Sequence, residues 1–223
     1  MTQLPLDFGI RPALGRADFL VASCNAAAIA WIDRWPDWPG PALALAGPAG
    51  SGKTHLVEVW CARSGAALID TAALAPDRVP ALLGAARAAA IDEADRADEE
   101  ALLHLYNLLA ERRGHVLLAA REPPARWGIA LPDLRSRLLA SPTVAVAAPD
   151  EALLGALLVK LFADRQLQIG EELIAYLVLQ LDRSFAAAQE MVAELDAASL
   201  ASSRAIAIPL ARELLIKRRR DPI

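Results

Sequence analysis

The segment Gly47-Pro48-Ala49-Gly50-Ser51-Gly52-Lys53-Thr54 decides the fold, because it is a complete G-x-x-x-x-G-K-[ST] phosphate loop. Its glycines allow consecutive backbone N–H groups to surround phosphate oxygens. Lys53 adds a positive charge for the β- and γ-phosphates, and Thr54 offers a hydroxyl to Mg²⁺. The apolar run 42–46 before the loop predicts a buried strand, and residues 54–63 after it have helical spacing. A strand, a glycine loop and a helix N-terminus in this order predict a site for a nucleoside polyphosphate.

Composition narrows the class of protein. The 223 residues, of which 55% are hydrophobic, suit one nucleotide-binding domain with a small appendage. The longest uncharged stretch, 38–52, is interrupted by prolines and glycines, so no membrane span is expected. Cys24 and Cys61 make no disulfide framework and indicate a reducing, cytoplasmic location. A net charge of −4 argues against nucleic-acid binding by the chain as a whole.

Strand and helix signals alternate between residues 17 and 148, which predicts an α/β domain with a parallel five-stranded sheet. Strands are expected at 42–46, 66–69, 88–91, 116–120 and 143–147, and helices at 25–34, 54–63, 79–87, 99–112 and 131–138. After Pro149 only helical patterns remain, so residues 149–223 are predicted to form a small helical lid. Residues 1–16 show neither period and are interpreted as a mobile tail.

The second half of the nucleotide site is expected where the strand 88–91 ends in Asp92-Glu93. Asp92 would hold Mg²⁺ through water, and Glu93 would orient and deprotonate an attacking water. Residues 95–100 are interpreted as a solvated acidic helix start. Arginines that follow the fourth strand and open the third lid helix could face developing phosphate charge, although a single surface arginine is more often only solvated.

Together these features resemble an AAA+ ATPase: the phosphate loop, the acidic strand end, the two arginine positions and the C-terminal helical lid. More narrowly, three stretches are similar to the bacterial replication initiator DnaA: Phe19-Leu20-Val21…Asn25, Glu122-Pro123-Pro124 and Leu134-Arg135-Ser136-Arg137-Leu138. DnaA continues into a helix-turn-helix domain that reads DNA, whereas this sequence ends at Ile223. The chain therefore resembles the Hda group of DnaA inactivators, and direct sequence-specific DNA binding is not expected.

The resemblance implies roles for individual side chains. Arg137 resembles the arginine finger donated to a neighbouring protein's ATP, and Arg135 is the rival candidate. Arg183 resembles the sensor-2 residue that contacts the chain's own ADP or ATP. Residues expected around the base are Phe19, Leu20, Val21 and Asn25.

One stretch departs from the family pattern. The family usually places a small polar residue at the end of the fourth strand, where it helps to position the attacking water, but this sequence has Ala119-Ala120-Arg121. Unless Arg121 substitutes for that residue, self-hydrolysis is expected to be slow. The chain would then act mainly as an activator of a partner's ATPase.

The N-terminal segment 3–8 resembles the peptide by which bacterial replication proteins dock on the sliding clamp, the β subunit of the DNA polymerase. In such a peptide an amide makes directional hydrogen bonds while apolar side chains fill a cleft. The residues expected to make these contacts are Gln3, Leu4, Leu6 and Phe8. The alternative is a tail that folds its leucines onto the domain.

The sequence thus predicts a nucleotide-binding AAA+ regulator that docks on the sliding clamp and stimulates ATP hydrolysis by DnaA, which prevents over-initiation of replication. One alternative is an accessory ATPase of a helicase or clamp loader. A second, from another class, is a P-loop small-molecule kinase, which would need an acceptor pocket where residues 150–223 instead indicate a packed bundle. The sequence leaves open whether the chain forms a homo-oligomer and whether it prefers ADP or ATP.

Overall fold

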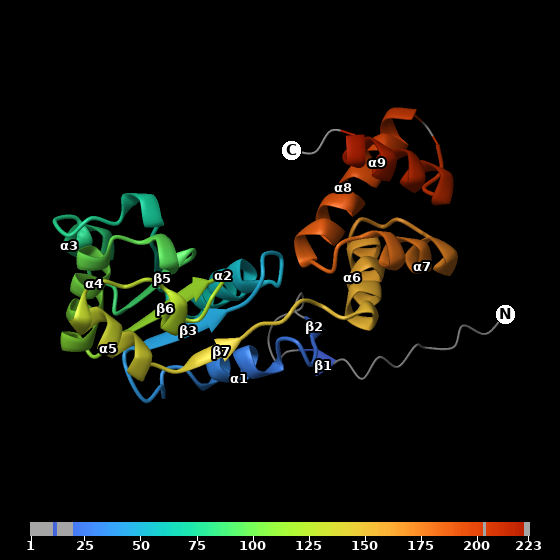
Figure 1. The fold of residues 1–223 in the computed structure, drawn as a ribbon. Coiled ribbons are helices and arrows are strands. Elements are labelled where there is room, and N and C mark those ends of the chain that lie inside the picture. The colour runs from blue at the N-terminus through green and yellow to red at the C-terminus, as the bar shows by residue number, and fades with distance from the viewer. Residues whose placement is uncertain (1–10, 13–19, 203, 221–223) are drawn as a thin grey trace. The chain divides into compact units, whose positions relative to one another are not determined.

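The computed structural model describes residues 11–12, 20–202 and 204–220 (Figure 1). These residues form two compact units. One unit comprises residues 23–147, and the other comprises the residues from 148 onward together with strands β1 (Arg11–Pro12) and β2 (Leu20–Val21), which pair antiparallel. Among the helices of the described residues, none combines the length and apolarity needed to cross a membrane.

A five-stranded parallel sheet forms the centre of the first unit, with the strand order β4–β5–β6–β3–β7. The strands are β3 (Ala42–Ala46), β4 (Ala67–Leu68), β5 (Ala88–Ile91), β6 (His115–Ala120) and β7 (Thr143–Ala145). Every residue of β3 and β5 is buried, as expected for parallel strands covered on both faces. The predicted sheet is therefore present, and its outer strands are shorter than the sequence pattern indicates.

Helices cover both faces of the sheet (Figure 1). They are α1 (Ala26–Arg34), α2 (Lys53–Ser64), α3 (Val79–Leu83), α4 (Glu99–Glu111) and α5 (Pro132–Ala140). One apolar cluster joins α4 and α5 to the side chains of β6 that point to their face, Val116, Leu118 and Ala120. The predicted helix 79–87 ends early, at Leu83, because Gly84 adopts φ 54° and ψ −128° and so cannot continue a helix.

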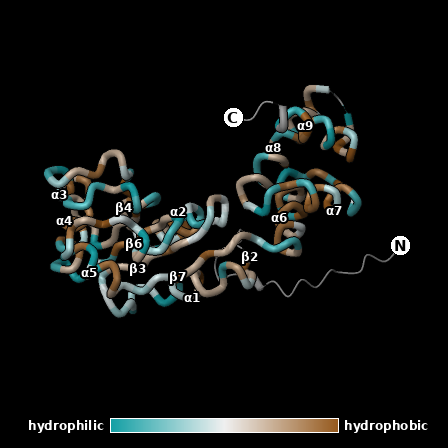
Figure 2. Tube along the Cα trace, viewed as in Figure 1, coloured by the Kyte–Doolittle hydropathy of each residue, from teal (hydrophilic) through white to brown (hydrophobic). Residues whose placement is uncertain are grey.

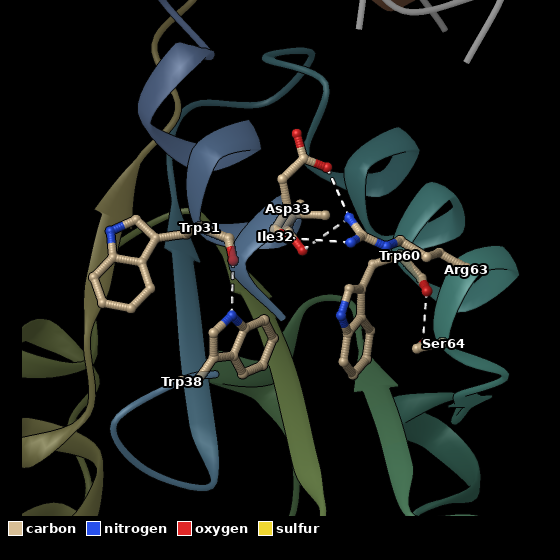
Figure 3. Close-up of polar contacts among 7 residues, drawn as sticks. All are labelled: Trp31, Ile32, Asp33, Trp38, Trp60, Arg63 and Ser64. Atoms are coloured by element: carbon tan, nitrogen blue, oxygen red, sulfur yellow. Dashed lines mark hydrogen bonds and ion pairs between the residues drawn. The ribbon is translucent and has the colours of Figure 1, made fainter. Parts of the chain in front are cut away.

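Tryptophan side chains pack at the edge of the sheet where the strands begin (Figure 3). The Trp38 ring stacks on Trp60 of α2 with centroids 5.4 Å apart, and Trp35 meets Trp60 edge-on at 6.0 Å. His115, the first residue of β6, packs edge-on against Trp35 and Trp38. Arg63 of α2 donates to Asp33 Oδ1 at 2.8 Å and to the Asp33 carbonyl at 3.1 Å. This cluster fastens α1 and α2 to each other at the edge opposite the phosphate loop.

The second unit has four helices with a core of their own among the residues that the structure describes. They are α6 (Glu151–Asp164), α7 (Glu171–Gln180), α8 (Phe185–Ser202) and α9 (Ile208–Arg220). Figure 2 shows hydrophobic residues gathered along α6 and α7, and Leu158, Phe162 and Met191 are completely buried. Arg218 of α9 donates to both carboxylate oxygens of Glu194 on α8 at 2.9 Å. The lid is thus a packed helical bundle, as the sequence pattern predicts.

Candidate functional site

The phosphate loop connects the carboxyl end of β3 to the N-terminus of α2. Gly50 (φ 72°) and Gly52 (φ 93°) adopt left-handed backbone conformations that favour glycine. At Gly47 an added Cβ would lie 2.0 Å from the Val146 carbonyl oxygen, so only glycine allows the loop to pass the segment that follows β7. Helix α2 begins at Lys53 and is 12 residues long, so the unpaired amides of its first turn and its dipole face the loop.

Lys53 is held inside the loop rather than in solvent. Its side chain is largely buried, with 8% of the residue exposed, and Nζ donates a hydrogen bond to the Pro48 carbonyl at 2.8 Å. Burial lowers the pKa of Lys53, the charge of Arg121 lowers it further, and nearby carboxylates, Asp92 above all, oppose both effects. Ser51 is also buried, and its hydroxyl has no hydrogen-bond partner within the described residues. The loop therefore presents polar groups that a bound anion could satisfy.

Thr54 and Asp92, predicted as the magnesium residues, lie side by side. The Thr54 hydroxyl donates to Asp92 Oδ2 at 2.5 Å, although the two residues come from α2 and from the end of β5. The hydroxyl of Thr71 donates to the Asp92 carbonyl oxygen at 2.7 Å and fixes the backbone there. A hydroxyl and a carboxylate are hard oxygen ligands, so the pair fits Mg²⁺, with water and phosphate oxygens as further ligands.

Glu93, predicted as the residue that activates water, is paired with an arginine. Its backbone is left-handed, with φ 50°, and its N–H donates to Asp92 Oδ1 at 2.9 Å. Arg96 Nη1 donates to Glu93 Oε2 at 2.8 Å, and both side chains are more than half exposed. To act on a water, the Glu93 carboxylate would have to leave or share this exposed ion pair.

A cavity of about 170 Å³ joins the predicted residues of the loop and of the two strand ends. Its walls are formed by Ala49, Gly50, Lys53, Thr54, Asp92, Glu93, Asp95, Arg96, Ala120 and Arg121. A second cavity of about 640 Å³ shares Asp92, Glu93 and Arg96 and extends along the residues that follow β4, including Asp70 and Thr71. The fold therefore brings together residues of three segments, 49–54, 92–96 and 120–121.

Arg137 lies on α5 and is not among the residues that line this cavity. Its Nε and Nη2 donate to the two carboxylate oxygens of Asp133 at 2.9 and 3.1 Å, and its guanidinium lies 5.5 Å from the centroid of the Tyr106 ring. These contacts raise the pKa of Arg137, chiefly through the hydrogen bonds to Asp133, and 36% of the side chain stays exposed. Arg135 is exposed, and its side chain forms neither a hydrogen bond nor an ion pair within the described residues. The two candidate fingers therefore differ, since only Arg137 is held in place.

The structure describes only some of the remaining residues that were predicted to contact the nucleotide or the clamp. Arg183 in the lid pairs with Glu151 at 2.5 Å. Leu20 and Val21 form β2, and Asn25 is buried directly before α1. The predicted roles of these residues stay predictions. Phe19 and the residues expected to bind the clamp, Gln3, Leu4, Leu6 and Phe8, lie outside the described residues.

Sequence reasoning missed several residues that shape the site. Glu99, at the start of α4, accepts hydrogen bonds from the backbone N–H groups of Ala130 and Leu131, directly before α5. The sequence pattern places Arg96 in a solvated acidic stretch, yet it pairs with Glu93. The spacing of Asp133 and Arg137, four residues apart in a helix, is a usable signal for their ion pair. No sequence signal points to Tyr106, because it reaches Arg137 from a different helix.

Comparison with known protein families finds a match for the second unit. A family model described as "Hda, lid domain" matches residues 151–215. This range runs from the first residue of α6 to within α9 and so covers the bundle of the second unit. The resemblance to the Hda group that the sequence indicates is thereby supported by the lid independently of the phosphate loop.

Comparison with solved structures identifies the fold of the chain. Domain III of DnaA from Thermotoga maritima matches with a TM-score of 0.74 and 18% identity, over 90% of this chain and 94% of that one. AMPPCP-bound DnaA from Aquifex aeolicus matches with a TM-score of 0.68 and 16% identity, over 80% of this chain and 63% of that one. A RuvB mutant from T. maritima matches with a TM-score of 0.70 and 15% identity, over 89% of this chain and 69% of that one. These matches confirm the predicted AAA+ fold, and the chain spans less than two thirds of the longer DnaA chain.

Proposed function

We propose that this chain, an AAA+ protein of the DnaA/Hda type, is a nucleotide-binding regulator that stimulates ATP hydrolysis by the replication initiator DnaA. The observation that carries the proposal is the combination of an Hda lid with a DnaA-like AAA+ core in one chain. A DnaA-like core alone would fit many AAA+ functions, since RuvB has a similar fold. The lid match favours the regulator over an accessory ATPase of a helicase or clamp loader.

The nucleotide site of the proposed regulator is formed by the phosphate loop and the residues around it. The amides at the start of α2, together with Lys53, would hold the phosphates of ADP or ATP. Thr54 and Asp92, which already contact each other, would hold Mg²⁺. When bound, the metal ion would neutralise phosphate charge between the β- and γ-phosphates. This assignment is supported by the nucleotide-bound DnaA of A. aeolicus, which has the same fold.

Hydrolysis by the chain itself is expected to be slow for two reasons that its own residues supply. Ala119 and Ala120, at the end of β6, are buried and offer neither a hydroxyl nor an amide side chain to position water. Glu93, the proton acceptor for that water, is engaged by Arg96. The site is therefore better suited to holding a nucleotide than to turning it over.

The activity toward DnaA would come from Arg137. A guanidinium supplied by one protein to another's nucleotide stabilises charge on the γ-phosphate and accelerates hydrolysis by roughly 10³–10⁵-fold in well-studied P-loop systems. Asp133 and Tyr106 keep the Arg137 side chain in one orientation while leaving part of it exposed, as a residue donated to a partner requires. Arg135 has no such support.

The decisive experiment measures ATP hydrolysis by DnaA with clamp-loaded DNA present. We compare the wild-type chain with Arg137→Ala, with Arg135→Ala as the matched control two residues away. Arg137→Ala should lose most of the stimulation, at least about tenfold, while Arg135→Ala keeps it. Arg137 contributes a partly exposed ion pair with Asp133 and a contact with the Tyr106 ring, each worth at most about 1 kcal/mol, so the melting temperature should fall only slightly. If only Arg135→Ala fails, the finger is Arg135, and if both variants stimulate normally the proposed action on DnaA is wrong.

Docking on the sliding clamp is the part of the proposal that rests on sequence alone. Its test is a pull-down with purified clamp, comparing the wild type with a Leu6→Ala, Phe8→Ala double variant. Asp7→Ala serves as the control, because Asp7 lies between the two proposed contacts. The double variant should lose clamp binding and Asp7→Ala should retain it. Equal binding by all three proteins would remove the clamp from the proposal without affecting the nucleotide site.

A further inference from the structure

Three arginines gather at the edge of the sheet where the strands begin, opposite the phosphate loop. Arg87 directly precedes β5, and Arg112 and Arg113 lie between the end of α4 and the start of β6. They belong to two turns, 84–87 and 111–115, that lead into neighbouring strands of the sheet. We call these three residues the arginine patch.

Contacts between the two turns hold the arginine patch together. The N–H of His115 donates to the Arg87 carbonyl at 2.9 Å. A Cβ added at Gly114 would lie 2.1 Å from the same carbonyl, so the turns approach as closely as their backbones allow. The side chain of Arg112 reaches back across the gap, where Nη1 donates to two backbone carbonyls of the turn 84–87 at 2.7 and 3.2 Å. The three side chains therefore start from one small, fixed area.

The charges of the arginine patch are not neutralised by carboxylates. The partners of Arg112 are neutral carbonyls. Arg87 and Arg113 are exposed, and their side chains form neither a hydrogen bond nor an ion pair within the part of the chain that the structure describes. The two turns contain a single acidic residue, Glu111. The patch is thus a positive area on a chain whose net charge is −4, and it would attract an anionic partner.

The backbone of Arg113 is a second sign that its side chain has a role. Its φ is 52°, in the left-handed region where glycine is the least strained residue. The N–H of Gly114 donates to the Leu109 carbonyl at 2.7 Å and closes the end of α4 there. Closing the helix does not require a long cationic side chain at position 113. A strained residue of this kind is more typical of a functional site than of a simple turn.

We propose that the arginine patch binds the phosphate backbone of duplex DNA without reading its sequence. The choice of DNA rests on the proposed function, in which the chain works beside a clamp loaded on DNA. A planar guanidinium matches two phosphate oxygens at once, and the duplex presents phosphates at short, regular intervals. Contacts to phosphates position a protein on DNA but carry no sequence information. Because the patch lies opposite the phosphate loop, DNA bound there leaves the nucleotide site open.

The size of the patch sets the expected strength of binding. Each phosphate contact contributes about −0.9 to the slope of log K against log salt, so three contacts give about −2.7. Raising the salt concentration from about 50 to about 200 mM should then weaken binding about fortyfold. Such binding is weak by itself. A chain tethered to a clamp on the same DNA gains from a high effective concentration, so the patch would orient the regulator rather than recruit it.

The test measures fluorescence anisotropy of a labelled duplex of about 20 base pairs and arbitrary sequence, at several salt concentrations. One double variant carries Arg87→Ala and Arg113→Gly, and the glycine also suits the left-handed backbone. Arg112 is left unchanged because it holds the two turns together. The matched control is Arg212→Ala with Lys217→Ala, which removes the same charge from two exposed positions of α9, the other basic segment. The first variant should bind at least about tenfold more weakly at about 50 mM salt, with a slope near −0.9, while the control keeps the wild-type slope.

Only a loss confined to the Arg87→Ala, Arg113→Gly variant supports the inference. Equal losses by both variants would mean that overall charge governs binding, and a loss by the α9 variant alone would place the contact on α9. Unchanged binding by both variants, or no binding by the wild type up to about 1 mM protein, would also overturn the inference. A poly-glutamate peptide that binds the patch more tightly than the duplex would show that the patch takes an acidic protein segment instead. None of these results bears on the proposed action on DnaA, which ATP hydrolysis measures separately.

Discussion

Glu99 offers a test of how the arginine-bearing helix α5 is held in place. Its carboxylate accepts hydrogen bonds from the Ala130 N–H, shared between its two oxygens at 3.0 and 3.1 Å, and from the Leu131 N–H at 2.8 Å. Leu131 is the residue directly before α5, and its own side chain does not cap this end of the helix. The substitution Glu99→Ala removes this acceptor and leaves both N–H groups without it.

The expected loss follows from these contacts. A hydrogen bond to a charged group stabilises a protein by about 1.5–3 kcal/mol, and the half-buried position lets water replace part of it. We therefore expect Glu99→Ala to lower the free energy of unfolding by about 2 kcal/mol in total. With a urea dependence of about 2 kcal/mol per M, the midpoint of unfolding should fall by about 1 M. Glu99→Gln keeps one acceptor oxygen, so its effect should be about half as large.

Tryptophan fluorescence in urea is the suitable assay, because all five tryptophans lie in the unit 23–147 and the lid does not contribute. Glu100→Ala is the control. Glu100 lies in the same first turn of α4, so its removal costs the same helix-dipole interaction, at most about 1 kcal/mol. The difference between the two variants isolates the hydrogen bonds to the α5 end. Equal midpoints for Glu99→Ala and Glu100→Ala would refute this reasoning.

Two further predictions concern the tryptophan edge of the sheet. Burial lowers the pKa of His115, so between that pKa and about 6.5 the unfolded chain binds more protons and stability falls with falling pH. His115→Gln should reduce the difference in urea midpoint between about pH 7.5 and about pH 5.5, on either side of the ordinary histidine pKa, and an unchanged difference would contradict the prediction. Trp60 is completely buried, so Trp60→Ala should lower the unfolding free energy by about 3–5 kcal/mol. Trp60→Phe should cost less than half of that, since it keeps an aromatic ring and removes a buried N–H without a described partner. Chemical unfolding followed by circular dichroism measures both, and equal losses would show that the aromatic ring area does not matter.

The sequence predicted the fold well because its signals are local. A phosphate loop needs glycines at fixed spacing, so residues 47–54 identify strand, turn and helix start together. Buried parallel strands need continuous apolar runs, which place β3, β5 and β6 to within a residue. The errors occurred at the ends of elements. Helix α3 stops at Leu83 because of the backbone of Gly84, a conformation that composition alone does not reveal.

The residue types of the candidate site can also be predicted from the sequence, but their contacts cannot. That Asp92 follows a buried strand indicates a position at the carboxyl edge of a sheet. That its carboxylate meets the Thr54 hydroxyl depends on the strand order β4–β5–β6–β3–β7, which arises from pairing between segments far apart in the chain. The same holds for Arg121, which reaches the phosphate loop only because β6 pairs with β3.

Side-chain contacts also differ in whether the sequence can predict them. Contacts within one helix, such as Asp133 with Arg137, follow from the helical period and can be predicted from spacing. Contacts between elements, such as Tyr106 with Arg137 or Glu99 with the start of α5, depend on how the helices pack on the sheet. The sequence by itself determined the elements and the chemistry that they carry, because both are set by neighbouring residues. The tertiary structure alone decided which groups of different elements meet and which of them face the phosphate cavity, because long-range packing fixes those distances.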